Sequence, residues 1–597
     1  MEEINVCESS EVRIGHTLNE AEKHHVANRA ATVLQCLKQH DIPCNAGAPK
    51  IAVMGSGGGL RAMVGLLGSL SQLKEEGLLD SITYLSGVSG STWCMASLYK
   101  ESDWSTNLEA VKDEIKARLT DTKVSRTKRG KKLKKYFCEK DNFSLTDVWA
   151  AMNVSYIVNE IDEHRLSDQR STYSNDPYPI YTVIDKKCKY DRLHADCWFE
   201  ITPDESGYSL TGAFVDSSCW GSQFENGQKI NKQPEIDILF LQGLCGSAIA
   251  DMEEILKFIF SELLMLSKEI TEEGDLPQTF NAKAGCKLIT TLLELYVSFL
   301  SGEDHSVHCE TLDGLLKGHD ILLNFLDKCD KSGHKISSTL HLVNSETFLH
   351  IYMNVTLIIC ECYFDWFADL LDEMWIAIVR AIEKAVHWYW GTTYNFVYKM
   401  KGSQNLWDEI WNAILREIEK AMHWIWRMTY NHDDKMKDSI LKSEKREYED
   451  AGLLNNSPYF SVLRQERDID LIISLDFSEG DPFKTVVDTA KICKELNMAF
   501  PEVVIPSGEN TEPQDFYVFC GSTKTPTVIH IPLFNCINCT GEVEKWKETY
   551  KTNQMEYTES MISDLMKKAG LNISNNKENL LKWIKYVTEQ KKFSTAV

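Results

Sequence analysis

The segment IAVMGSGGGLRAMVGLLGSLSQL, residues 51–73, contains the clearest structural pattern in the chain. Residues 51–54 form a short apolar run, as expected for a buried strand. A glycine cluster follows at residues 55–59, and apolar side chains then recur at helical spacing as far as Leu73. Gly77 is a natural helix stop. The segment predicts a strand, a tight loop and a helix in direct succession.

The segment SITYLSGVSGSTWCMASLY, residues 81–99, repeats this order. A second strand is predicted at residues 82–85, a loop at 86–91 and a helix at 92–99. Two such units predict an α/β fold with a central, mainly parallel sheet wrapped by helices. Chemistry in such sheets takes place at the carboxyl ends of the strands, and both loops lie there. Further strands are predicted at residues 237–240, 471–475 and 527–530.

Residues 252–445 have a different, mostly helical pattern. We interpret them as a helical cap inserted into a single catalytic domain, whose core spans about 45–250 and 440–597. Within the cap, residues 372–401 closely match residues 408–437, a local duplication with a period of 36 residues. Trp388 and its counterpart Trp424 lie off the apolar stripe of each copy. These helices either pack into a core or present their tryptophans to a lipid surface.

Composition narrows the class of protein. The chain has 597 residues, of which 43% are hydrophobic, so a large core is possible. Its formal net charge of −24 argues against a nucleic-acid partner, because the chain would repel phosphates. We find no signal-peptide pattern and no apolar run long enough to cross a membrane. Together with 18 scattered cysteines, this predicts a cytoplasmic protein with reduced thiols.

A basic run between residues 123 and 135 is the strongest local exception to the acidic balance. It is either a solvated loop or a patch that binds anionic lipid headgroups, where each cation contributes about 1 kcal/mol. Its cations are Lys123, Arg126, Lys128, Arg129, Lys131, Lys132, Lys134 and Lys135.

The glycine cluster permits three functions, because the free N–H groups at a helix start can hold an anion. A phosphate-binding P-loop needs a Lys-Ser/Thr pair after the glycines, and the sequence has none there. A dinucleotide site would use Gly57, Gly59 and Ala62, with Glu75 or Glu76 spaced for a ribose contact. The third function is an oxyanion hole, which needs a nucleophile nearby.

The second loop supplies a candidate nucleophile. Residues 87–91, GVSGS, resemble the nucleophile elbow G-x-S-x-G, with Ser91 in place of the last glycine. A serine between glycines is often only a turn residue. Here Ser89 follows a predicted strand and precedes a predicted helix, and this context favours catalysis. The two loops together predict acyl transfer, with a hydroxyl and a set of donors at one end of a sheet.

These motifs, GSGGGLRAM at 55–63 and SGVSGSTW at 86–93, resemble the cytosolic phospholipase A2 family, a relative of the patatin-like lipases. The resemblance covers roughly residues 45–250 and 440–545, while the cap is divergent. It is closest to the form without a calcium-binding membrane domain. Further segments agree, namely PYPIY at 177–181, WFEITP at 198–203, FLQGLCGS at 240–247 and HIPL at 530–533.

The resemblance assigns a role to each residue of the predicted site. It implies that Ser89 is the nucleophile and that Arg61 holds the substrate phosphate. Gly57, Gly58 and Gly59 would surround the oxyanion hole, with Gly58 and Gly59 as the favoured donors.

The resemblance also points to the partner of the serine. The family's catalytic aspartate lies in an Asp-x-Gly context before Asn and Pro. The sequence EDAGL at 449–453, followed by Asn456 and Pro458, matches this pattern. It selects Asp450 over the neighbouring Glu449, and it implies a Ser–Asp dyad without histidine.

The implied function is that of a calcium-independent phospholipase A2 that forms an acyl-serine intermediate, with lysophospholipase and transacylase activity. We expect no cofactor and no metal. The expected partners are a phospholipid substrate and the surface of intracellular membranes, to which the cytoplasmic protein binds peripherally. Only about 50 residues precede the glycine loop, so we expect no calcium-binding lipid domain. The carboxyl terminus has no cysteine, so we expect no prenylation.

Two alternatives belong to other functional classes. One is a catalytically inert lipid-binding protein built on a hydrolase fold. The other, less favoured, is a nucleotide-binding oxidoreductase that uses the glycine cluster.

Overall fold

The structure is a computed structural model that describes residues 11–140, 144–171, 175–190, 197–225, 227–231, 233–249, 446–505, 512–522 and 525–594. The chain divides into two units, one of Met1–Ala250 with Ser439–Val597 and one of Asp251–Asp438. Every described residue belongs to the first unit. The predicted duplication, with Trp388 and Trp424, lies outside the described residues.

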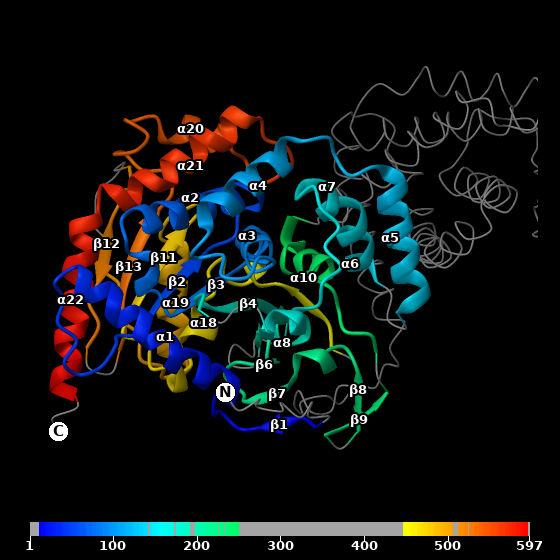
Figure 1. Cartoon of the computed structure of the whole chain (residues 1–597), viewed down its shortest axis with the longest axis horizontal. Helices are drawn as coiled ribbons and strands as arrows, with labels where there is room; N and C mark the ends of the chain where they lie inside the picture. The colour runs from blue at the N-terminus through cyan, green and yellow to red at the C-terminus, as the bar shows by residue number, and fades with distance from the viewer. Residues whose placement is uncertain are drawn as a thin grey trace, which may run out of the picture. The chain divides into compact units, whose positions relative to one another are not determined.

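The strands come from both described halves of the first unit (Figure 1). They are β1 (Arg13–Ile14), β2 (Ile51–Gly55), β3 (Tyr84–Gly87), β4 (Tyr178–Asp185), β5 (Trp198–Ile201), β6 (Glu205–Tyr208), β7 (Ala213–Asp216), β8 (Gln223–Glu225), β9 (Gln228–Asn231), β10 (Tyr448–Asp450), β11 (Leu471–Asp476), β12 (Tyr517–Phe519) and β13 (Thr527–Pro532).

Helices flank these strands. They are α1 (Glu20–Gln39), α2 (Gly59–Glu75), α3 (Gly90–Leu98), α4 (Leu108–Thr120), α5 (Arg126–Glu139), α6 (Leu145–Val148), α7 (Ser155–Ile157), α8 (Lys186–Tyr190), α10 (Ile238–Cys245), α18 (Tyr459–Val462), α19 (Lys484–Glu495), α20 (Val543–Thr549), α21 (Glu559–Ser574) and α22 (Lys577–Ser594). No helix in the described part of the chain combines the length and apolar character that crossing a lipid bilayer requires.

One 11-stranded mixed sheet organises the unit, in the order β1-β7-β6-β5-β4-β3-β2-β11-β13-β12, with β10 paired to β4. The strands from β4 through β3, β2 and β11 to β13 are parallel, whereas the outer pairs are antiparallel. The α/β fold with flanking helices is confirmed. The parallel strands form the centre of the sheet. There β11 lies beside β2, although the two strands are more than 400 residues apart in the sequence (Figure 1).

The two strand–loop–helix units have the predicted order. β2, β11 and β13 begin at the predicted residues, and β3 begins two residues later than predicted. Residues 51–55 and 471–476 are buried throughout, because both faces of the central strands are covered. Gly77 adopts a φ of 70° just after α2, as expected for a residue that ends a helix.

The strand predicted at residues 237–240 is wrong, since this segment opens helix α10. Asp237 is the helix N-cap, and its carboxylate accepts a hydrogen bond from the Phe240 amide at 2.9 Å. A short apolar run does not distinguish a buried strand from a buried helix. The aspartate before the run, which is a common helix N-cap, was the residue that indicated a helix.

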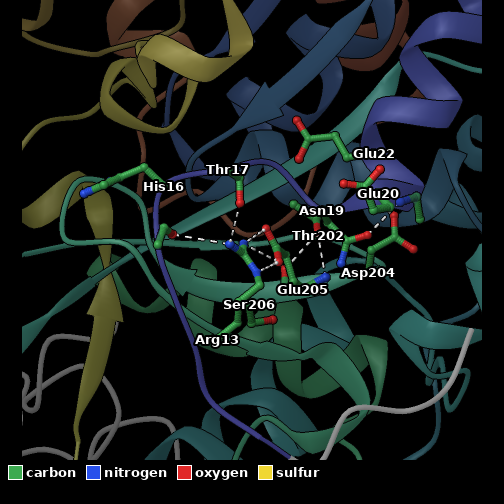
Figure 2. A network of polar contacts seen from close by, with 12 residues as sticks. Arg13, His16, Thr17, Asn19, Glu20, Glu22, Thr202, Asp204, Glu205 and Ser206 are labelled. Carbon is green, nitrogen blue, oxygen red and sulfur yellow. Dashed lines mark hydrogen bonds and ion pairs between the residues drawn. The ribbon is translucent and has the colours of Figure 1, made fainter.

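At the β1 edge of the sheet, an ion pair links β1 to β6. β1 pairs with β7, and the Arg13 guanidinium donates to both carboxylate oxygens of Glu205 on β6, at 2.7 and 2.8 Å. Figure 2 shows this contact, with the Thr17 hydroxyl as a further acceptor at 3.4 Å. The contact anchors the segment before α1 to the antiparallel half of the sheet.

Strand β4 aligns the two segments that carry the predicted nucleophile and base. β3 pairs with β4 as far as Gly87 opposite Tyr181, and β10 pairs with β4 so that Asp450 lies opposite Val183. β5 occupies the other edge of β4 over the same residues, so β10 must share the edge used by β3. Asp450 therefore lies in line with the end of β3, beside the turn that carries Ser89.

Candidate active site

Ser89 occupies a strained turn between β3 and α3. Its φ is 52° and its ψ is −124°, which is unusual for a residue other than glycine. The glycines on either side of this turn are closely packed, and at Gly90 the neighbour is backbone. A Cβ on Gly90 would lie 1.9 Å from the Gly59 carbonyl oxygen, and one on Gly87 would lie 2.7 Å from the sulfur of Met95. The sequence thus brings the serine turn into direct contact with the glycine loop, in the manner of a nucleophile elbow.

The glycine loop lies against Ser89 at the start of α2. A Cβ on Gly57 would lie 2.8 Å from the Ser89 Cβ, and Gly58 has a φ of 152°, which favours glycine. The Gly57 amide donates to the Asn456 carbonyl at 3.0 Å, so it is already occupied. Among the described residues, the amides of Gly58 and Gly59 have no hydrogen-bond acceptor. These two amides are therefore available to an oxyanion, with the positive end of the helix dipole behind them.

Asp450 is completely buried beside Ser89. Its two carboxylate oxygens accept the amides of Ala248 at 2.9 Å and Gly452 at 2.8 Å, and the Ser89 side chain lies near enough to lower its pKa. Burial raises the pKa of Asp450 to about 6 and outweighs these hydrogen bonds, which lower it. A much better base than an ordinary aspartate thus lies beside the serine.

Asn456 connects the aspartate segment to the glycine loop. Its side-chain amide donates to the Gly57 carbonyl at 3.1 Å and to the Ser478 hydroxyl at 2.8 Å. A Cβ on Gly57 would lie 2.2 Å from the Asn456 Oδ1. Asn456 thus fixes the distance between the segment that carries Asp450 and the loop that carries the amide donors.

Arg61 lies in the first turn of α2 with 1% of its side chain exposed. It donates from Nε to the Phe477 carbonyl at 2.8 Å, from Nη1 to the Tyr550 carbonyl and from Nη2 to the Thr552 hydroxyl at 2.9 Å. The structure therefore places this predicted phosphate ligand directly behind the glycine loop, with all three nitrogens already hydrogen-bonded.

Histidine takes no part in this arrangement as far as the structure describes it. No described histidine contacts Ser89 or Asp450. His530 lies on β13, where its Nε2 is 2.6 Å from the Pro482 carbonyl, and burial lowers its pKa. A buried histidine with a lowered pKa, held by a backbone carbonyl, has a structural role.

The structure brings together all six predicted site residues, Gly57, Gly58, Gly59, Arg61, Ser89 and Asp450. Sequence reasoning missed the roles of Ser247 and Asn456. The Ser247 hydroxyl accepts the Asp450 amide at 3.2 Å, and the next residue donates to the Asp450 carboxylate. Both residues lie in segments that resemble the family. Their positioning roles become visible only from their hydrogen bonds to Asp450 and Gly57.

The basic run lies in helix α5 from Arg126 onward, and two of its cations face inward. Arg129 and Lys132 are buried, and Lys132 forms ion pairs with Glu163 at 2.7 Å and Asp237 at 2.6 Å. Lys128 and Lys131 are exposed. The run is an amphipathic helix rather than a loop, and its outer cations alone could meet a charged surface.

Comparison with known proteins agrees with this fold. Residues 51–273 match the family described as the lysophospholipase catalytic domain. The chain is similar to cytosolic phospholipase A2 gamma of Mus musculus, with 32% identity over 590 residues that cover 94% of this chain and 90% of that protein. The Homo sapiens protein of the same name is 33% identical over 584 residues, which cover 96% of each chain.

A solved structure, human GIVD cytosolic phospholipase A2, matches with a TM-score of 0.61 at 20% identity, over 98% of this chain and 67% of that one. At this identity the likeness shows the fold alone. The fold and the matched domain define a lipid ester hydrolase with a mixed α/β sheet. The chain belongs to the cytosolic phospholipase A2 family, which confirms the resemblance seen in its sequence and the predicted phospholipase A2 or lysophospholipase class.

Proposed function

We propose that the protein is a calcium-independent phospholipase A2 that hydrolyses the fatty-acyl esters of glycerophospholipids through an acyl-serine intermediate. The observation that carries this proposal is the position of Ser89 beside a buried Asp450 with a raised pKa. A nucleophile beside a base, next to two available amides, has the parts that acyl transfer requires.

In the first half-reaction, the Ser89 oxygen attacks the ester carbonyl while its proton passes to the Asp450 carboxylate. The amides of Gly58 and Gly59 bind the developing oxyanion. When the tetrahedral intermediate collapses, the ester C–O bond breaks and the protonated Asp450 gives its proton to the departing lysophospholipid oxygen. Acyl-Ser89 remains, and Asp450 is again a carboxylate.

In the second half-reaction, Asp450 takes a proton from water as the water attacks the acyl-serine. Collapse releases the fatty acid, and Ser89 recovers its proton. A lysophospholipid hydroxyl can replace water as the acceptor, so the same site supports transacylation, and a lysophospholipid ester can replace the first substrate. Arg61 is the proposed ligand of the substrate phosphate, which it would attract as a charge beside the oxyanion loop.

The proposed site needs no calcium, because Asp450 and the glycine amides provide the base and the charge stabilisation. We place the enzyme in the cytoplasm, in peripheral contact with intracellular membranes. The exposed face of α5 is one candidate for that contact. The tryptophans at 388 and 424 are another, which remains a prediction outside the described residues.

We predict that Ser89→Ala abolishes ester hydrolysis, with a loss of several orders of magnitude, while the fold is retained. A fluorophosphonate probe should label the wild-type protein at Ser89 and leave Ser89→Ala unlabelled. Ser91→Ala is the matched control for the label, since Ser91 lies in the same turn but donates to the Ser56 carbonyl at 2.6 Å. Absence of labelling and turnover in the wild type would instead favour an inert lipid-binding protein.

A further inference from the structure

The charge of Arg61 is poorly compensated in its buried setting. Its three closest acceptors are the Phe477 and Tyr550 carbonyls and the Thr552 hydroxyl, none of which is charged. Burial lowers the pKa of Arg61, against the opposing influence of Tyr557 and Glu479. A buried cation with neutral ligands attracts any anion that can reach it.

An anion from the protein already lies next to this cation. The Glu479 carboxylate is 3.6 Å from the Arg61 Nη1, and it is the one carboxylate that forms an ion pair with Arg61 among the described residues. It also accepts the Thr552 amide at 2.8 Å. Burial favours a higher pKa for Glu479, but the hydrogen bonds from Thr552 and the charge of Arg61 outweigh it, so its pKa lies below the ordinary value.

Glu479 is held loosely compared with the loop that carries it. Its side chain is 44% exposed, and 3.6 Å exceeds a normal hydrogen-bond length. The preceding residue, Ser478, accepts the Asn456 side-chain amide at 2.8 Å, and Asn456 also binds Gly57. Ser478 is thus linked to the glycine loop through Asn456, while the Glu479 side chain is partly open to solvent.

The arrangement also lies close to the reacting atoms. A Cβ on Gly58 would come within 3.1 Å of the Arg61 Nη2 and within 2.7 Å of the Phe477 carbonyl. The Arg61 guanidinium therefore contacts the oxyanion loop through Nη2 and faces Glu479 through Nη1.

We propose that Glu479 determines specificity by acting as an internal competitor of the substrate phosphate for Arg61. A phospholipid binds productively only when its phosphate displaces the Glu479 carboxylate and overcomes the repulsion between the two anions. A neutral ester makes no contact with Arg61 and is unaffected by Glu479. This inference rests on the proposed function, and it concerns only the recognition of the phosphate.

The variant Glu479→Gln tests this competition. Glutamine has the same size, and its amide oxygen can still accept the Thr552 hydrogen bond, but it carries no charge. With phosphatidylcholine in neutral-detergent micelles, we expect kcat/KM to rise about two- to fivefold, the range for a partly exposed ion pair. Hydrolysis of a short neutral p-nitrophenyl ester should be unchanged. The gain should shrink as salt screens the pair.

Glu20→Gln is the matched control, because Glu20 is an exposed glutamate on α1 that pairs with Lys23. It should change neither substrate. An equal change on both substrates for Glu479→Gln, or no change on either, would overturn the proposal. A lower Tm with parallel losses on both substrates would also overturn it, since Glu479 would then only balance the buried charge of Arg61. If the wild type hydrolyses neither substrate, the proposed function itself fails.

Discussion

Asp450 acquires its chemical properties from where it is buried. An ordinary aspartate is too weak a base to accept a serine proton, because its pKa is about 4. Complete burial raises the pKa of Asp450 to about 6, despite the two backbone amides and the nearby Ser89 that stabilise the carboxylate. The carboxylate is therefore ionised at neutral pH and still basic enough to act in general base catalysis.

This raised pKa predicts the pH dependence of the enzyme. The base must be unprotonated, so kcat/KM for a neutral ester should fall about tenfold per unit as the pH drops below about 6, and level off above it. Measurement from pH 4.5 to 8 on a soluble ester checks this.

A histidine base would give a similar acidic limb, so the type of acid must be determined as well. Organic cosolvent disfavours the charged form. It moves the limb to higher pH if the acid is a neutral carboxyl, and not if it is an imidazolium cation. A limb that stays in place or moves to lower pH would contradict the dyad.

Asn456 offers a second prediction for a single residue. Asn456→Ala removes the amide that holds Gly57 and Ser478, so the amide donors and the aspartate lose their fixed separation. We expect kcat to fall about 10- to 100-fold, with little change in KM, on both phospholipid and neutral ester. Steady-state kinetics normalised by fluorophosphonate titration of active sites measures this loss.

The neighbouring Asn455→Ala is the matched control. Asn455 donates to the Thr485 carbonyl and the Thr489 hydroxyl, away from the glycine loop. It should lower the free energy of unfolding and leave the turnover of each folded molecule close to normal. If Asn455→Ala and Asn456→Ala lower the normalised kcat equally, Asn456 has no special positioning role.

The packing of α2 against α21 shows how an element holds the site. α2 begins at the glycine loop, so its position sets the position of the amide donors. At the crossing, a Cβ on Gly68 would lie 2.7 Å from the Cα and the carbonyl oxygen of Met566. Backbone atoms cannot move aside as a flexible side chain can, so the two helices approach closely only because residue 68 is glycine.

Gly68→Ala should therefore destabilise the protein although alanine favours helix. The overpacking costs about 1–3 kcal/mol, against a gain of at most about 1 kcal/mol in helix propensity. Urea unfolding provides the measurement.

Gly570→Ala is the control in the same interface, because its new Cβ would meet only the Gln72 side chain, at 3.1 Å. It should be close to neutral. Equal free energies of unfolding for the two variants would show that the helices are free to separate.

The elements that sequence reasoning predicted are those with local signals. The apolar runs of β2, β11 and β13 and the glycine–serine loops can be read directly from neighbouring residues. The wrong prediction at residues 237–240 has a local cause, because so short an apolar run fits both the helical and the strand period. The position of Asp450 in the fold could not be predicted from such local signals. It depends on β10 pairing with a strand more than 260 residues away, and no local pattern specifies that pairing.

On the scale of the whole molecule, a buried ionic network joins the amino-terminal helix to the carboxyl-terminal half. Arg467 donates to Glu22 on α1 at 2.9 Å and to Glu200 on β5 at 2.8 Å, and Arg464 donates to Glu200 at 2.5 Å. Burial alone would raise the pKa of Glu200, but Arg467 and Arg464 bring it down to about 2. Such a network makes each partner costly to remove.

We expect Glu200→Gln to lower the free energy of unfolding by about 3–5 kcal/mol at pH 7, because it leaves buried arginines without their anion. The pKa of Glu200 is depressed in the folded state, so its contribution is present above its ordinary pKa and is lost as the pH falls toward 2. Urea unfolding at pH 7 and at lower pH should show the gap between wild type and variant narrowing below about pH 4.

Glu205→Gln is the matched control for this network, because its partner Arg13 is one-third exposed. Burial raises the pKa of Glu205 despite Arg13, so its charge stabilises the fold little and its removal should lower the free energy of unfolding by about 1 kcal/mol or less. A gap for Glu200→Gln that is constant across the pH range would contradict the assignment.

The sheet order affects when the site can form during synthesis of the chain. A ribosome releases the chain from its amino terminus, and β11, which fills the centre of the sheet between β2 and β13, comes from the last quarter of the sequence. Asp450 arrives only just before it. A nascent chain that exposes Ser89 therefore lacks both its base and the strand that supports the glycine loop. A nascent chain can therefore act as an esterase only after both of these segments have emerged.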